Sequence, residues 1–238
     1  MTLLWQAESV HFVDLPALDA AVVNCRACPR LVAWRESVPG TKAAFAGETY
    51  WSRPVPGFGP ADAALAVVGL APSAHGANRT GRMFTGDPSG DFLFRVLHEA
   101  GLASQPTSTG IGDGLTLRGT RLVAPVRCAP PANKPTPAER DNCRSWLATE
   151  LDLLRPTLRA VVVLGAFGWQ ALMPVLEEAG WPVPKPRPPF AHGGVLQLAD
   201  LRVFGCYHVS PRNVQTGRVT HSMVLDVFTA AASAAGLF

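Results

Sequence analysis

Four short apolar runs alternate along the chain with stretches of helical periodicity, and this alternation limits the folds that the chain can adopt. The apolar runs lie at Ala64–Leu70, Arg121–Val126, Ala160–Leu164 and Leu201–Val209. Short apolar runs bounded by turn residues are typical of buried strands. The helical patterns lie at Leu18–Arg35, Asp91–Gly101, Pro137–Leu154, Phe167–Gly180 and Val219–Ala235. The alternation predicts a three-layer α/β/α fold in which helices cover both faces of a central, mainly parallel sheet.

A single domain is expected to span residues 1–238, because no repeat and no compositionally distinct linker divides the chain. Hydrophobic residues make up 47% of it, and the longest apolar stretch is Ala160–Trp169. That stretch is about half of the roughly 20 residues that a bilayer helix needs. Met1–Val10 lacks the cationic flank and apolar run of an export signal. We therefore expect no membrane partner and a location in the reducing cytoplasm. The protein is also expected to be a monomer.

The cysteines indicate a metal site. Cys25 and Cys28 form a tight pair on or beside the first helix, Cys128 follows the second strand, and Cys143 lies on the next helix. In a reducing compartment such cysteines favour metal binding or catalysis over disulfides. Four thiolates can hold zinc or a [4Fe–4S] cluster, and the wide spacing of the second pair favours the cluster. The alternative is buried, reduced cysteines that act as small hydrophobic residues, which is our prediction for Cys206.

The basic residues leave two interpretations open. The chain has a net charge of +3, with 18 arginines among its 21 basic residues. Arginine offers planar bidentate donors to phosphate, but a GC-rich genome yields the same bias. Leu201–Leu225 carries three arginines, two histidines and no carboxylate.

The loops that follow the strands are expected to hold the chemistry, because ligands of open α/β sheets bind beyond the carboxyl ends of the strands. These loops are Ala71–Gly90, Cys128–Thr136 and Ser210–Thr220. Gly165 and Gly168, after the third strand, are expected only to turn the chain. The chain contains neither GxGxxG nor GxxxxGK[ST], so nucleotide binding of the Rossmann or P-loop kind has no support.

The loop after the first strand is the most informative segment. Phe84 stands among glycines and arginines and suits a flat heterocycle better than a core, while Arg79 and Arg82 are candidates to hold phosphates. Asp87 precedes Pro88, which also fits a plain helix start, since Asp is a favoured N-cap and Pro a favoured first helical residue. Both roles are compatible, because a carboxylate at a helix N-terminus is oriented and available.

Three motifs and the cysteines together resemble a known family. The motifs are Gly-Leu-Ala-Pro at Gly69–Pro72, Gly-Arg-Met-Phe-Thr-Gly-Asp at Gly81–Asp87, and His-Val-Ser-Pro-Arg-Asn at His208–Asn213. They resemble the uracil-DNA glycosylase superfamily, most closely its family five, the iron–sulfur B-type enzymes. The likeness keeps the same order from about Cys25 to Thr220. It implies a four-stranded parallel sheet between helices, a [4Fe–4S] cluster, and removal of uracil and related deaminated bases from DNA.

The resemblance also implies roles for polar residues. His208 is the leading donor to the departing base, although a strand-end histidine is otherwise a hydrogen-bonded structural residue. Many members of the superfamily have a carboxylate or amide where this chain has Leu70 and Ala71, which leaves Asp87 to orient water or stabilise the sugar cation. Asn133 is implied to contact the base or the water, or else is simply a turn former. The residues implied to bind the substrate are Gly69, Leu70, Ala71, His75, Phe84, Asn133 and His208.

Single- or double-stranded DNA containing uracil is the implied partner. The loop from Arg212 to Arg218 would fill the gap left by the extruded base, and Lys185–Pro189 would run along phosphates or form an ordinary surface loop. The residues expected to contact DNA are Arg79, Arg82, Lys185, Arg187, Arg212, Asn213, Gln215 and Arg218. The cluster is expected to be structural, holding the loop of Asn133 in place.

Two competing interpretations belong to other functional classes. One is a non-catalytic damaged-DNA-binding module, which the Leu70-Ala71 departure favours because it removes the usual water-positioning group. The other is a zinc-stabilised nucleotide-binding α/β protein.

Overall fold

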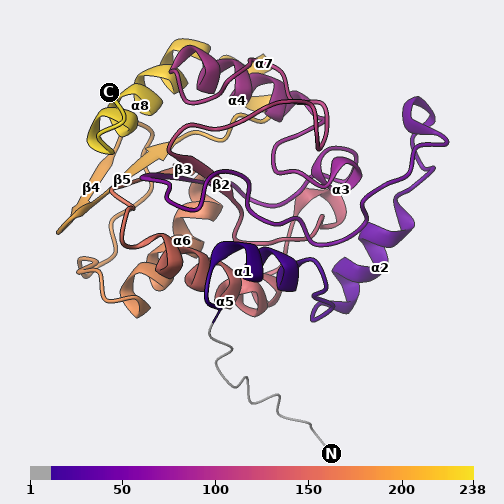
Figure 1. The fold of residues 1–238 in the computed structure, drawn as a ribbon, viewed down its shortest axis with the longest axis horizontal. Helices are drawn as coiled ribbons and strands as arrows, with labels where there is room; N and C mark the ends of the chain where they lie inside the picture. The colour runs from indigo at the N-terminus through magenta and orange to yellow at the C-terminus, as the bar shows by residue number, and fades with distance from the viewer. Residues whose placement is uncertain (1–11) are drawn as a thin grey trace, which may run out of the picture.

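A computed structural model describes residues 12–238, so Met1–Val10, where no export signal is expected, lies outside the described residues. One five-stranded sheet has the strand order β2-β1-β3-β5-β4 (Figure 1). The strands are β1 (Leu65–Val68), β2 (Thr120–Val123), β3 (Ala160–Leu164), β4 (Val195–Leu198) and β5 (Leu201–Cys206). The first three and β5 run parallel, and β4 pairs antiparallel with β5. The predicted α/β/α class is therefore confirmed.

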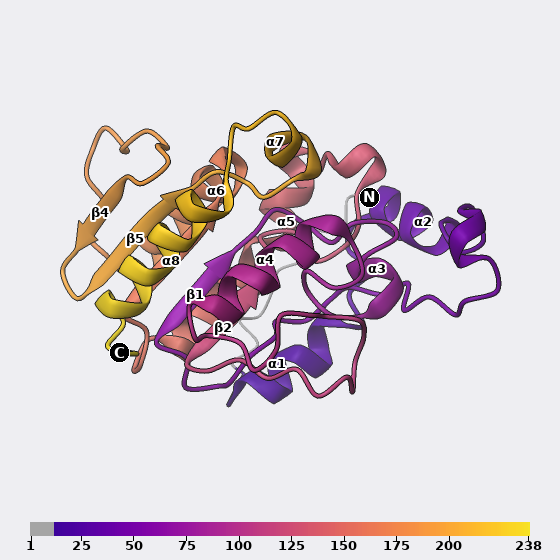
Figure 2. The ribbon, with the colours of Figure 1, turned by 90° about the horizontal axis from the view of Figure 1, so that it is seen from above.

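Helices cover both faces of the sheet, as Figures 1 and 2 show. On one face α4 (Pro88–Glu99) and α8 (His221–Ala234) bury one hydrophobic core. On the other, α1 (Leu15–Val22), α5 (Pro137–Leu154) and α6 (Ala166–Glu178) bury a second core. Every residue of β1 and β3 is buried, as expected for strands packed on both sides.

Shorter elements connect these layers and lie mostly where the parallel strands end. They are α2 (Pro29–Ser37), η1 (Ala43–Phe45), α3 (Ala77–Thr80), η2 (Pro131–Asn133) and α7 (Pro211–Gln215). Because β1 pairs in register with both β2 and β3, the carboxyl ends of the parallel strands meet at one edge of the sheet. That edge is where the predicted site residues should converge.

The structure corrects two sequence predictions. The sheet has five strands rather than four, because β4 adds an antiparallel edge strand that is only partly buried and so lacks a buried apolar run. The helix predicted over Leu18–Arg35 is two helices, α1 and α2. Pro29 starts α2, and a residue before proline avoids the helical region, so Cys28 is extended, with ψ of 93°.

No helix within residues 12–238 is long and apolar enough to cross a membrane. Cys206 is fully buried in β5, which confirms it as a core residue. The prediction for Gly165 is confirmed, with φ of +92°, but that for Gly168 is wrong. Gly168 lies inside α6, where a Cβ would stand 2.8 Å from the Gly69 carbonyl oxygen, so it allows close packing instead.

Candidate active site

A cavity of about 440 Å³ lies beyond the carboxyl ends of β1, β2 and β5, and we call it the central cavity. Its volume is in the usual range for small-ligand sites. It is lined by five of the residues predicted to bind substrate: Leu70, Ala71, Phe84, Asn133 and His208. Asp87 lines it too, together with Ser73 and Ser210, which the sequence did not single out.

A second hollow of about 660 Å³, the adjoining groove, shares part of this wall. Ser73, Asp87, Pro88 and Asn133 line both spaces. The groove is further lined by Lys42, Phe45, His75 and Arg79. His75, predicted to bind substrate, therefore faces the groove, where its Nδ1 lies 2.9 Å from the Tyr50 hydroxyl.

His208 follows β5, and a hydrogen bond holds its backbone: the main-chain carbonyl accepts from the Asn213 side chain at 2.7 Å. Gly165 leaves room for it, because a Cβ at residue 165 would lie 3.2 Å from the His208 Cβ. Burial lowers the pKa of the imidazole, and the nearby Asp87 carboxylate only partly opposes this. The ring is therefore a neutral imidazole at neutral pH, with one donor and one acceptor nitrogen.

Asp87 is the N-cap of α4, so the structural role proposed for it is confirmed. Its Oδ1 accepts hydrogen bonds from the amides of Ser89 and Gly90, both at 3.0 Å. Its Oδ2 accepts a hydrogen bond from the Ser73 hydroxyl. The carboxylate is nevertheless part of the central cavity wall.

Phe84 is held in a left-handed backbone conformation, with φ of +53°. A bulky residue in this region costs about 1–3 kcal/mol and persists only where its surroundings enforce it. Two glycines leave room for it: a Cβ at Gly69 would lie 2.6 Å from the ring, and a Cβ at Gly90 would lie 1.8 Å from the Phe84 carbonyl oxygen. Gly69 therefore does not line the cavity but lies behind the ring that does.

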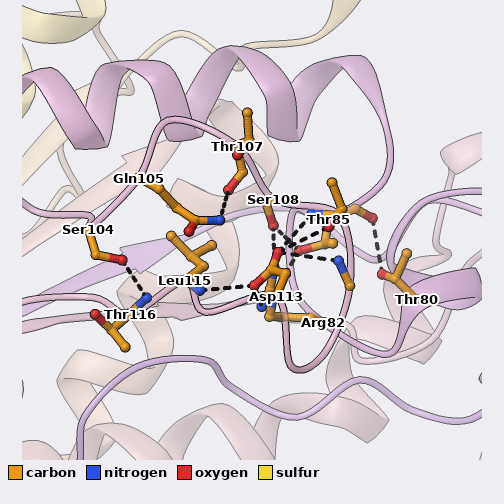
Figure 3. A network of polar contacts seen from close by, with 12 residues as sticks. Thr80, Arg82, Thr85, Ser104, Gln105, Thr107, Ser108, Asp113, Leu115 and Thr116 are labelled. Carbon is orange, nitrogen blue, oxygen red and sulfur yellow. Dashed lines mark hydrogen bonds and ion pairs between the residues drawn. The ribbon is translucent and has the colours of Figure 1, made fainter.

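A buried ion pair between Arg82 and Asp113 joins the loop that carries Phe84 to the neighbouring loop (Figure 3). Arg82 forms bonds of 2.8 and 2.5 Å to the two carboxylate oxygens of Asp113 and donates to Ser108 and Thr85. Arg82 holds the pKa of Asp113 well below its usual range, with backbone amides such as that of Leu115 assisting. The prediction that Arg82 contacts phosphate is wrong, because the side chain is only 6% exposed and its donors are used internally.

Two more residues predicted to contact DNA have internal partners. Arg79 pairs with Glu48 at 2.7 Å and stacks over Phe45, so its charge is largely committed to the groove wall. The Asn213 amide is used to hold His208. Both observations favour positioning roles over direct phosphate contact.

The remaining predicted DNA contacts are accessible. Arg212 and Gln215 are exposed on α7, and Arg218 is exposed with its guanidinium over the Tyr207 ring. Lys185 and Arg187 are exposed but share one carboxylate, Glu177. Arg212, Gln215 and Arg218 all lie on the segment that directly follows His208.

Asn133 ends the short helix η2 with φ of +55°, a conformation that asparagine tolerates well. Its loop is tied to α2, because Arg30 donates to the Lys134 carbonyl at 3.0 Å and to Glu139 at 2.9 Å. Glu139 also belongs to the capping box that starts α5. The loop is thereby connected to the helix that follows the first cysteine pair.

The four cysteines predicted to hold a metal line a single cavity. Cys25 and Cys28 come from the segment between α1 and α2, Cys128 from the loop after β2, and Cys143 from α5. Burial raises the pKa of Cys128 to about 11 and of Cys143 to about 12, so both are neutral thiols unless a cation displaces the proton. Within residues 12–238 no three His, Cys, Asp or Glu side chains converge closely enough to hold a single metal ion.

Two buried arginines border this cysteine cavity and lack partners for some of their donors. Arg35 donates to Cys128 Sγ at 2.9 Å, and the Arg127 amide donates to Cys143 Sγ at 3.4 Å. Arg127 also pairs with the buried Glu150. Within residues 12–238, the Nε atoms of both arginines and one terminal nitrogen of Arg127 have no hydrogen-bond partner. Unpaired cationic donors of this kind are costly unless an anion lies nearby.

Comparison with known proteins identifies similar chains. The model of the uracil DNA glycosylase superfamily matches residues 56–231. A Mycobacterium tuberculosis protein named type-5 uracil-DNA glycosylase is 52% identical over 222 residues, which is 92% of this chain and 81% of that protein. A Thermus thermophilus protein of the same name is 51% identical over 226 residues, 94% of this chain and 100% of its own length. One from Pyrobaculum aerophilum is 45% identical over 215 residues, 90% and 91% of the two chains.

Proposed function

The chain belongs to the uracil DNA glycosylase superfamily, and from that premise we propose that it removes uracil from DNA by hydrolysing the N-glycosidic bond. The reacting bond is shielded inside a duplex, so the nucleotide must first rotate out of the base stack. Water then adds to the sugar carbon while the bond to the base breaks. The base leaves with the electron pair, and the proton that the water loses balances the negative charge of the departing base. The enzyme acts as a hydrolase in base-excision repair.

One observation carries the proposal: His208 and Asp87 line the same cavity, although they come from the loops after β5 and β1. Cleavage creates negative charge on the base and positive charge on the sugar. A fixed donor on one side and a carboxylate on the other stabilise both charges. The aromatic ring of Phe84 in the same wall offers a platform for the extruded base.

His208 would donate a hydrogen bond from its neutral imidazole to an oxygen of the departing base. Its partly buried position supports this role, because the hydrogen bond would strengthen once the base fills the cavity and displaces water. Asp87 would face the sugar and orient the attacking water. Asn133, which borders both the central cavity and the adjoining groove, would contact the base or that water.

The proposal extends to other deaminated bases. Much of the central cavity wall is apolar, with Leu70, Ala71, Ala77, Met83 and Ala124 among its lining residues. Few polar groups are therefore placed to reject a base that differs from uracil in ring size or substituents. Excision of hypoxanthine and xanthine from matched oligonucleotides would support this broader range.

Contact with the DNA strand would come from the loop after His208. Arg212, Gln215 and Arg218 are exposed there, next to the central cavity. Lys185 and Arg187 would add weaker contacts, because both also interact with Glu177. These exposed cations would hold the DNA strand while a nucleotide enters the central cavity.

A [4Fe–4S] cluster would be held by Cys25, Cys28, Cys128 and Cys143. The four side chains line one cavity without converging on a single point, and a four-iron cluster spreads its thiolate ligands farther apart than one zinc ion does. The unpartnered donors of Arg35 and Arg127 fit a group of net negative charge. When bound, the cluster would supply structural linkage between α2, the loop after β2 and α5.

The test of function is a single-turnover assay with an oligonucleotide that contains one deoxyuridine, followed by alkaline strand scission. We expect an abasic product from that strand and none from the matched thymidine strand. Tight binding to the uracil strand without any abasic product would contradict excision and favour a damaged-DNA-binding module.

The cofactor has its own test, which does not depend on activity. Aerobically purified protein should be brown and contain about four iron and four sulfide ions per chain, and Cys128→Ala should lose both colour and solubility. A colourless protein that contains stoichiometric zinc would overturn the cluster assignment.

A further inference from the structure

Most acceptor positions of the Asp87 carboxylate are already occupied. The amides of Ser89 and Gly90 both donate to Oδ1 at 3.0 Å. The Ser73 hydroxyl donates to Oδ2. Because each carboxylate oxygen offers two lone pairs, one position on Oδ2 is left for chemistry.

The backbone at Gly76 brings Ser73 and Asp87 together. A Cβ at residue 76 would lie 2.2 Å from both Ser73 Oγ and Asp87 Oδ2, so only glycine allows this approach. The Ser73 carbonyl meanwhile accepts a 3.1 Å hydrogen bond from the Asn78 amide, which fixes the turn that presents the hydroxyl. The pair is thus enclosed by main chain on one side.

Both side chains remain accessible to a substrate on the other side. Ser73 and Asp87 each line the central cavity and the adjoining groove, at the boundary between the two. Within the described part of the chain, the Ser73 hydroxyl makes no hydrogen bond other than that to Asp87. The Asp87 carboxylate is therefore the group that orients the Ser73 hydroxyl.

We propose that Ser73 is a positioning residue that holds Asp87 Oδ2 so that its free lone pair faces the sugar and the attacking water. This inference rests on the proposed excision of uracil and on Asp87 as the group that serves the sugar side. The helix cap alone fixes only Oδ1, and the carboxylate can still tilt about it. The hydroxyl removes that remaining freedom, which matters because attack requires near-ideal alignment of the reacting atoms.

A double-mutant cycle tests the coupling between the two residues. The variants are Ser73→Ala, Ser73→Thr, Asp87→Asn and the Ser73→Ala/Asp87→Asn double variant, with Ser233→Ala on the exposed face of α8 as the matched control. Asparagine keeps an oxygen for the helix cap, so Asp87→Asn separates the cap from the charge. Each variant is measured by single-turnover excision at saturating enzyme, by its Kd for the uracil strand and by its melting temperature.

We expect Ser73→Ala to lower the single-turnover rate roughly tenfold, the scale of a hydrogen bond to a charged group. Its Kd should stay within about twofold and its melting temperature should not change, since the hydroxyl acts on the reaction rather than on binding or folding. Ser73→Thr should recover most of the rate. In the Asp87→Asn background, removal of the hydroxyl should change the rate less than about twofold.

If the wild-type protein excises uracil and Ser73→Ala does so at the same rate, this inference alone is overturned. Fully additive losses of rate in the double variant would overturn it too. Absence of excision by the wild-type protein would instead overturn the proposed function.

Discussion

The environment of His208 controls both its protonation and its proposed role. Burial lowers the pKa of the imidazole from its ordinary 6.5, and Asp87 only partly restores it. A neutral ring keeps one N–H group, so it can still donate one hydrogen bond to the departing base. We predict that His208→Ala lowers the single-turnover excision rate by about 10²–10³, the usual cost of removing one such donor. His221→Ala, a surface histidine on α8, should leave the rate unchanged.

The same pKa shift predicts how stability depends on pH. The folded protein binds the proton at His208 less readily than the unfolded chain, so the free energy of unfolding falls as pH drops from about 6.5 toward the lowered pKa. His75 and His192, whose pKa values burial also lowers, act in the same direction. Denaturant unfolding of His208→Asn should show a smaller loss of unfolding free energy over this pH range. If the unfolding free energy of wild type and variant depends on pH in the same way, the lowered pKa of His208 is contradicted.

Gly69 supports the proposed platform for the base through close contact with Phe84. A methyl group at this position would lie 2.6 Å from the ring, so Gly69→Ala must displace it. We predict destabilisation by about 1–3 kcal/mol in denaturant unfolding, together with a lower excision rate. Gly110→Ala is the matched control, because a Cβ there meets nothing within 4 Å. Equal stability of Gly69→Ala and wild type would show that the ring moves freely.

Sequence motifs predicted many of the cavity residues but not how their neighbours are bonded. His208, Asp87 and Phe84 were identifiable because their motifs are contiguous in sequence. Arg82 belongs to the same motif, yet its partner Asp113 lies on a separate loop, so its burial could not be foreseen. Ser73 lacked a signal because its role depends on the close approach at Gly76.

At the scale of helices, α2 links the cysteine cavity to the loop of Asn133. Arg30 on α2 donates to the Lys134 carbonyl and pairs with Glu139 in the first turn of α5. We predict that Arg30→Ala increases amide hydrogen exchange over residues 131–136 and lowers the excision rate several-fold. The loss of unfolding free energy should stay below about 1 kcal/mol, since the arginine is partly exposed.

The control for this prediction is Arg26→Ala, which removes an exposed ion pair with Glu36 and no contact to the loop. If both variants exchange these amides at the wild-type rate, α2 does not hold the Asn133 loop.

The elements themselves were largely predictable where a periodic pattern was long. The bounds of α5 and β3 agree with the pattern residue for residue, since a capping box and a continuous buried run mark them. The break between α1 and α2 was missed because apolar residues continue across it, although Pro29 was the available signal. The strand β4 was missed because an edge strand shows only partial burial.

Across the whole molecule, buried ion pairs connect the helix layer to the sheet, and these pairs could not be predicted from the sequence. Glu150 lies between Arg121 and Arg127, and Arg121 also pairs with Asp19 on α1. Burial alone would raise the pKa of Glu150, but the two arginines hold it below its ordinary value. This network connects α1, β2 and α5 behind the cysteine cavity and depends on tertiary packing that no local pattern encodes.

DNA binding should weaken as salt concentration rises, because exposed cations would displace counterions from phosphates. Removing one true phosphate contact lowers the slope of log K against log salt by about 0.9 for duplex DNA. We predict this change for Arg212→Ala, measured by fluorescence anisotropy. Arg202→Ala is the control, since Arg202 lies near the start of β5 at the opposite edge of the sheet. A slope unchanged in both variants would remove Arg212 from the interface.

The most direct measurement is a crystal structure of Asp87→Asn bound to a duplex with a single deoxyuridine. The account predicts that the uracil is rotated out of the helix and lies in the central cavity, with its ring against Phe84 and one carbonyl oxygen within hydrogen-bond distance of His208. A uracil that remains stacked in the duplex, or that binds at another surface of the protein, would contradict the account.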